Sequence, residues 1–140
     1  MYIDLGGRIN ANAGWQTLDS KPPADFVHDL GTPLPFKDGE VDMFRAHHIL
    51  EHIHDLCGLM DELWRCLKPG GMLDIEVPHV RHGAAFHDPT HVRYFTECTF
   101  DYFVRLTYFG YVKHYWEFFE EPKMVGANKD CLALTLRKPL

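Results

Sequence analysis

The sequence lacks the features that would point to a membrane, to nucleic acid or to a disulfide framework. No apolar run approaches the roughly 20 residues that a bilayer-spanning helix needs. The 14 lysines and arginines are scattered among 20 acidic residues, and the net charge of −6 offers a phosphate backbone no basic stripe. The four cysteines lie far apart without a C-x-x-C pair, which argues against a thiolate zinc site. We therefore expect neither a membrane nor a nucleic-acid partner.

The composition predicts one soluble domain over residues 1–140. Of the 140 residues, 46% are hydrophobic and 24% are charged, which is enough for a core of its own. The opening MYIDLGG has neither the basic region nor the apolar run of a signal peptide. With the cysteines interpreted as reduced thiols, this predicts a cytoplasmic protein. The aromatic content of 14% permits a homodimer interface.

The first half of the chain alternates between β-type runs and a helix. Five short apolar runs predict strands at residues 2–5, 15–19, 25–30, 41–46 and 72–78. Asp55 is the expected N-cap of a helix in which apolar residues recur at helical spacing from Leu56 to Leu67. The helix should end at Lys68-Pro69-Gly70-Gly71. Strand, helix and strand on this spacing predict a parallel sheet with ligands at the carboxyl ends of its strands.

The second half begins with a loop that is rich in polar side chains. Residues 79–95 show no period and are crowded with histidine and arginine, so we expect a functional loop. Thr96 is predicted to cap a second helix that carries Phe100 and Phe103 among its apolar residues. The tail predicts a β-hairpin around residues 126–128. The fold class is therefore α/β, a mostly parallel sheet closed by a C-terminal antiparallel hairpin.

One short motif raises the question of a metal. Residues 48–52, His-Ile-Leu-Glu-His, match the H-x-x-E-H pattern of inverted zinc proteases. Such a site needs a further protein ligand from another helix, and a chain mostly committed to a sheet leaves little room for one. We therefore predict no metal and keep a metal-dependent hydrolase as an alternative. A second possible ligand set lies in the loop: His79, His82, His87, Asp88 and His91.

Several motifs occur together in one order. LPFKDGEVD, HHILEH and LKPGG follow one another between residues 28 and 79, and DPTHVRYFT lies at residues 88–96. In this combination the chain resembles the class I S-adenosylmethionine-dependent methyltransferases, specifically the small type 11-like group, over nearly its whole length. The resemblance implies a minimal Rossmann-like fold. It also implies methyl transfer from S-adenosylmethionine to an unidentified small-molecule acceptor.

The resemblance also implies a cofactor site at the first strands. It assigns six residues to S-adenosylmethionine: Asp4, Gly6, Gly7, Asp19, Asp29 and Leu30. Asp4 and the glycines would meet the methionine end, where a missing Cβ allows close approach. Asp19 would accept hydrogen bonds from the ribose hydroxyls, and Asp29 with Leu30 would flank the adenine. Each position also has a local alternative, as a turn residue or a cap.

The first loop departs from the family pattern. The family usually has D/N-L-G-C-G, whereas this chain has Asp4-Leu5-Gly6-Gly7-Arg8. The connection that follows, from Gly6 to Gly14, is also short for a helical crossover. These departures motivate a second hypothesis, a non-catalytic binding or assembly module with a degenerate cofactor loop.

Histidines supply the candidate catalytic groups. Six lie near the expected cleft: His47, His48, His52, His79, His87 and His91. Their unperturbed pKa near 6.5 suits a general base. We single out His91, with His48 second, and assign Asp88 and Arg93 to the acceptor because the D-P-T-H-x-R loop should cover that side. The alternatives are histidines that hydrogen-bond the backbone, and a Glu51 that pairs locally or orients a neighbour.

Overall fold

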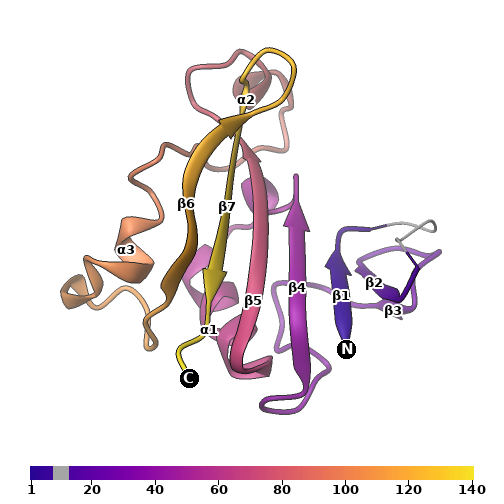
Figure 1. The fold of residues 1–140 in the computed structure, drawn as a ribbon. Coiled ribbons are helices and arrows are strands. Elements are labelled where there is room, and N and C mark those ends of the chain that lie inside the picture. Colours follow the sequence, from indigo (N-terminus) through magenta and orange to yellow (C-terminus); the bar gives the residue numbers. More distant parts are fainter. Residues whose placement is uncertain (8–12) are drawn as a thin grey trace.

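The computed structural model describes residues 1–7 and 13–140, and within them seven strands form one sheet in the order β3-β2-β1-β4-β5-β7-β6 (Figure 1). The strands are β1 Tyr2–Leu5, β2 Trp15–Asp19, β3 Phe26–Val27, β4 Val41–His47, β5 Leu67–Pro78, β6 Glu117–Val125 and β7 Cys131–Arg137. β1 to β5 are parallel, whereas β7 runs antiparallel to both β5 and β6. The predicted α/β fold, mostly parallel and closed by a C-terminal hairpin, is confirmed.

Short helices fill the connections. They are η1 Leu50–His52, α1 Leu56–Cys66, α2 Ala84–His87, α3 Asp101–Val104 and η2 Thr107–Phe109. α1 begins as predicted, because the Asp55 carboxylate accepts a hydrogen bond from the Gly58 amide at 2.9 Å. None of these helices has the length and apolar character needed to cross a bilayer.

The two faces of the sheet differ in character. Alternating residues of β4 and β5, such as Phe44, Leu73 and Ile75, are fully buried on the side of the sheet that packs in the core with α1. The opposite face includes a row of polar register partners that crosses five strands: Thr17, Asp4, Arg45, Asp74 and Thr135. Parallel sheets are usually covered on both faces by crossover helices. The connections over residues 6–14 and 20–25 are shorter than the dozen or so residues of a helical crossover.

Several predicted elements have different bounds in the structure. The strand expected at 25–30 is only Phe26–Val27, because the Asp25 side chain is bonded to Thr17. α1 ends at Cys66, and β5 follows directly from Leu67 rather than from residue 72.

The helix predicted to begin at Thr96 is α3, a single turn from Asp101. Instead of capping a helix, Thr96 donates its amide to Thr99 Oγ1 at 3.0 Å, which closes a local turn.

Candidate functional site

The carboxyl ends of the first four strands surround a cavity of about 180 Å³. Its lining residues are Gly6, Asp19, Ser20, His28, Asp29, Leu30, Ile49, His52 and Ile53. These residues belong to the segments that follow or end β1, β2, β3 and β4. The structure therefore brings together four of the six residues assigned to the cofactor by resemblance. Asp4 and Gly7 are not among the lining residues.

Local hydrogen bonds fix the two carboxylates in this cavity. Asp19 Oδ1 accepts a hydrogen bond from the Lys21 amide at 2.9 Å, and Asp29 Oδ1 accepts one from the Gly31 amide at 2.8 Å. Both are the turn contacts that the sequence offered as alternatives to ligand binding. Turn formation and a position in the cavity wall are therefore compatible for both residues. Each bond engages one carboxylate oxygen and so orients the group.

Asp4 is engaged by the protein itself. Its Oδ2 lies 2.5 Å from Arg45 Nη2 and its Oδ1 lies 3.1 Å from Arg45 Nε, and this bonding raises the pKa of Arg45. A Cβ on Gly7 would lie 2.5 Å from Asp4 Oδ2. Gly6 has φ +71°, and a Cβ there would meet Ile49 at 2.9 Å. Both glycines are thus required by neighbouring protein groups. Arg8 lies outside the described residues.

A second cavity of about 350 Å³ adjoins the first at His52, which lines both. Its lining residues are His48, Glu51, His52, Pro78, Ala84, Asp88, His91, Asp130 and Cys131. They come from η1 and the chain before it, the end of β5, the loop over residues 79–95 and the start of β7. One cavity therefore lies at the predicted cofactor positions, and its neighbour is lined by titratable side chains.

Glu51 is the buried charged residue in the wall of this second cavity. Its side chain is 2% exposed, and its Oε1 lies 3.8 Å from His48 Nδ1 and 3.9 Å from His91 Nε2. Its Oε2 is buried and has no hydrogen-bond partner within the part of the chain that the structure describes. The prediction that Glu51 pairs locally therefore accounts for one oxygen and leaves the other unexplained.

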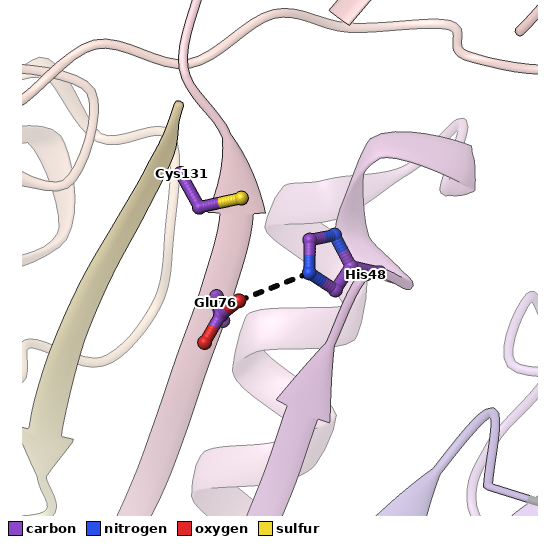
Figure 2. Close-up of side chains that lie close together, drawn as sticks. All are labelled: His48, Glu76 and Cys131. Carbon is purple, nitrogen blue, oxygen red and sulfur yellow. Dashed lines mark hydrogen bonds and ion pairs between the residues drawn. The ribbon is translucent and has the colours of Figure 1, made fainter. Parts of the chain in front are cut away.

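His48 has an unusual backbone and two carboxylate neighbours. Its φ is 55°, a left-handed conformation that is uncommon outside glycine. Its Nε2 donates to Glu76 Oε1 at 3.0 Å, with the Cys131 side chain close by (Figure 2). Glu51 and then Glu76 raise the pKa of His48, so the protonated form is favoured. Burial raises the pKa of Cys131 to about 11, which keeps it a thiol at neutral pH.

The ring orientations of His91 and His52 follow from their partners. His91 Nδ1 lies 2.9 Å from the Ala85 carbonyl, which can only accept, so Nδ1 carries the proton. Thr90 Oγ1 donates to Asp88 Oδ1 at 2.6 Å and so accepts from His52 Nδ1 at 2.9 Å. In both neutral rings Nε2 is therefore the basic atom. His91 Nε2 lies 3.7 Å from Asp88 Oδ2.

The two residues assigned to the acceptor have different positions. Asp88 lines the second cavity, and hydrogen bonds from Thr90 lower its pKa. Arg93 lines neither cavity. Its Nε donates to the Ile53 carbonyl at 2.7 Å and its Nη2 to the His54 carbonyl at 2.6 Å. Arg93 thus fastens the polar loop to the chain after η1, and its role in substrate binding stays a prediction.

The other three candidate histidines, His47, His79 and His87, line neither cavity. His47 bonds Asp74 at 2.8 Å, and His79 is buried with its Nε2 3.0 Å from Glu97. His87 is exposed and lines neither cavity. The ligand set proposed for the loop is not assembled. Across residues 1–7 and 13–140, the groups of potential metal ligands are Glu51, His52 and His91, and His48, Glu76 and Cys131.

Sequence reasoning missed Glu76, Cys131 and Asp130. Glu76 reads as an ordinary strand residue, and Cys131 is 55 positions away from it. The antiparallel register of β5 and β7, which pairs Pro78 with Cys131, brings these residues to the same end of the sheet. Only the strand pairing, which the hairpin motif does not specify, could have indicated this neighbourhood.

Comparison with known proteins identifies the family of the chain. The methyltransferase domain family model matches residues 3–75. An uncharacterized methyltransferase of Mycobacterium sp. (strain KMS) is 40% identical over 47 residues, 34% of this chain, and the match spans about a fifth (19%) of that relative's length.

Two solved structures share the fold. A SAM-dependent methyltransferase of Methanosarcina mazei has a TM-score of 0.68 at 14% identity, covering 99% of this chain and 92% of that one. The N-methyltransferase NodS of Bradyrhizobium japonicum, in complex with S-adenosyl-L-homocysteine, has a TM-score of 0.62 at 15% identity, covering 99% and 78%. With the family model matching more than half of its residues, this chain belongs to the methyltransferase domain family, and its sheet is that of the Rossmann-like S-adenosylmethionine-dependent enzymes.

Proposed function

We propose that the protein binds S-adenosylmethionine in the first cavity and transfers its methyl group to a small molecule in the second. The observation that carries the proposal is that His52 lines both cavities. One holds carboxylates at the ends of parallel strands, where open α/β sheets bind their ligands. The other holds groups that can orient a polar acceptor and accept its proton.

The residues of the first cavity fit the proposed cofactor. Asp19 ends β2 with its carboxylate held in a turn, and such a group can accept from both ribose hydroxyls. Asp29 offers the same chemistry after β3, beside the apolar side chain of Leu30. Ile49 and Ile53 complete an apolar wall. Asp4 and Gly7 do not line this cavity and would support it indirectly. Asp4 would do so through its ion pair with Arg45, and Gly7 through the turn that it forms with Gly6.

When bound, S-adenosylmethionine supplies an electrophilic methyl group for an in-line displacement. The protein's contribution is largely alignment of the acceptor, since orientation alone can supply much of the rate. A base is needed only for an acceptor that must lose a proton. In the metal-free protein His91 is the first candidate, because its Nδ1–H is anchored on Ala85 and its Nε2 is basic. His48 is the second candidate, because Glu51 and Glu76 favour its protonated form, which cannot accept a proton.

Thermal unfolding with and without S-adenosylmethionine and S-adenosylhomocysteine tests the proposal. A ligand at about 100 times its Kd adds roughly 2.7 kcal/mol, which raises the midpoint by several degrees in a domain of this size. Asp19→Ala should reduce the shift strongly. Glu120→Gln, on an exposed position of β6, serves as the matched carboxylate control and should keep it.

A non-catalytic binding or assembly module is the second candidate. It is favoured by the Asp4–Arg45 ion pair, which already occupies a carboxylate assigned to the methionine end. The side of the sheet that carries the row from Thr17 to Thr135 would then serve a partner. The absence of any midpoint shift at millimolar ligand would favour this function over methyl transfer.

A further inference from the structure

The second cavity contains a set of side chains whose donor atoms suit a metal ion. Glu51, His52 and His91 each offer one ligand atom, and the three atoms lie within 4.8 Å of one another. We propose that these three residues form a binding site for a divalent transition-metal ion, with Zn²⁺ as the best match. Two imidazoles and one carboxylate are a ligand set that proteins use for Zn²⁺ and Fe²⁺ in open, reactive sites. The inference goes beyond methyl transfer and does not depend on it.

His52 and His91 each make, through Nδ1, the kind of hydrogen bond that metal-ligating histidines make. A ligating imidazole nearly always donates its other ring N–H to a carbonyl, a carboxylate or a similar acceptor. His91 donates Nδ1–H to the Ala85 carbonyl, and His52 donates Nδ1–H to Thr90, which is itself bonded to Asp88. In both rings the proton is therefore held on Nδ1 and the lone pair on Nε2 is free before any ion arrives.

The buried carboxylate supplies an independent observation. Glu51 is 2% exposed and lines the cavity, and its Oε2 has no hydrogen-bond partner among the described residues. Burial of a carboxylate oxygen without a partner is costly, and native structures rarely tolerate it. A bound cation would neutralise this charge and coordinate the unsatisfied oxygen.

The three donor atoms lie within 4.8 Å of one another and must move closer together to bind an ion. Donor atoms at about 2.1 Å from a tetrahedral ion lie about 3.4 Å apart. His91 Nε2 and Glu51 Oε1 are 3.9 Å apart, and His52 is half-buried and can adjust. Three protein ligands leave an open position, and the cavity of about 350 Å³ has room there for water or an acceptor oxygen. With an ion bound, His91 Nε2 is a ligand and no longer a base.

A neighbouring group of ligand-type residues is the main rival. His48, Glu76 and Cys131 lie in the same region, with the His48 ring already bonded to Glu76 (Figure 2). Its carboxylate, Glu76, is 30% exposed to solvent and contributes no buried oxygen without a hydrogen-bond partner among the described residues. It differs in chemistry from the proposed site because it includes sulfur, so spectroscopy can separate the two.

Metal binding by protein without a His tag, stripped with a chelator, tests the inference. Isothermal titration with Zn²⁺, followed by metal analysis after dialysis, should show one bound equivalent. Glu51→Gln and His91→Gln should each weaken binding by at least about 30-fold, the effect of losing one ligand. His54→Gln removes an exposed histidine two residues from His52 and should stay within about twofold of wild type. If Glu51→Gln fails to fold, His52→Gln takes its place.

Three results would overturn the inference. One is the absence of stoichiometric zinc in the wild-type protein, and another is binding that the Glu51 and His91 variants leave intact. The third comes from Co²⁺, a coloured substitute for zinc: a thiolate charge-transfer band that Cys131→Ser removes would assign the ion to the rival set. Thermal shifts with S-adenosylmethionine on the same samples report separately on the cofactor site, so failure of one proposal is distinguishable from failure of the other.

Discussion

Asp4 and Arg45 are register partners on β1 and β4 and form a bidentate ion pair, with 13% and 17% of their side chains exposed. The pair lies in the polar row that crosses the sheet, and Arg45 also lies 4.7 Å above the Trp15 ring. Because both groups are mostly shielded from water, each depends on the other for its hydrogen bonds.

Replacement of Asp4 by Ala should therefore destabilise the protein by about 2 kcal/mol, since it leaves the Arg45 guanidinium without its partner. Urea unfolding monitored by tryptophan fluorescence measures this loss. The matched control is Glu120→Ala, which removes the carboxylate of the exposed Lys123–Glu120 pair and should cost less than about 1 kcal/mol. Equal losses in the two variants would contradict a special role for the Asp4 pair.

His48 should make stability depend on pH in the neutral range. Its pKa is raised in the folded protein, chiefly by Glu51. Its stabilising contribution is therefore fully present below its unfolded pKa of about 6.5 and is lost as pH rises through the folded value. The difference in unfolding free energy between wild type and His48→Asn should shrink from pH 6 to pH 9. Asn keeps the left-handed backbone accessible. A difference that grows with pH would refute this sign.

The backbone at His48 allows a separate test. At φ 55° a Cβ is strained, so His48→Gly should be more stable than His48→Ala by about 1 kcal/mol, although both lose the imidazole. The neighbouring position gives the control, because His47 belongs to strand β4. There Gly should be less stable than Ala, by about 0.5–1 kcal/mol. Thermal or urea unfolding of the four variants decides, and the same order at both positions would argue against backbone strain.

The sequence predicts this fold better than it predicts the site. Hydrophobic spacing located α1 and its Asp55 cap, because these depend on neighbouring residues alone. The shortening of β3 and α3 could not be anticipated, since it depends on side-chain bonds such as that between Asp25 and Thr17. The site could not be anticipated either, because it depends on the pairing of strands that are distant in the sequence. Glu76 and Cys131 meet His48 only through the register of β5 and β7.

Arg93 shows why a motif can mark a position without fixing its role. The D-P-T-H-x-R loop suggested an acceptor-binding arginine, yet its guanidinium donates to the carbonyls of Ile53 and His54. These two charge-assisted hydrogen bonds join residues that are 40 and 39 positions apart in the sequence, and they should hold the loop against the segment after η1. Arg93→Ala should therefore expose residues 79–95 to proteolysis. Arg93→Lys should restore protection only in part, because an ammonium cannot reproduce the planar fork.

Limited proteolysis and amide hydrogen exchange of the loop measure this effect, with Arg81→Ala as the control at an exposed arginine of the same segment. The control should leave both readouts unchanged. Loop opening in Arg93→Ala without loss of the S-adenosylmethionine thermal shift would assign Arg93 to positioning, because the loop borders the second cavity rather than the first. If Arg93→Ala left the loop unaltered but weakened acceptor binding, the result would instead support the substrate-binding role that the motif predicts.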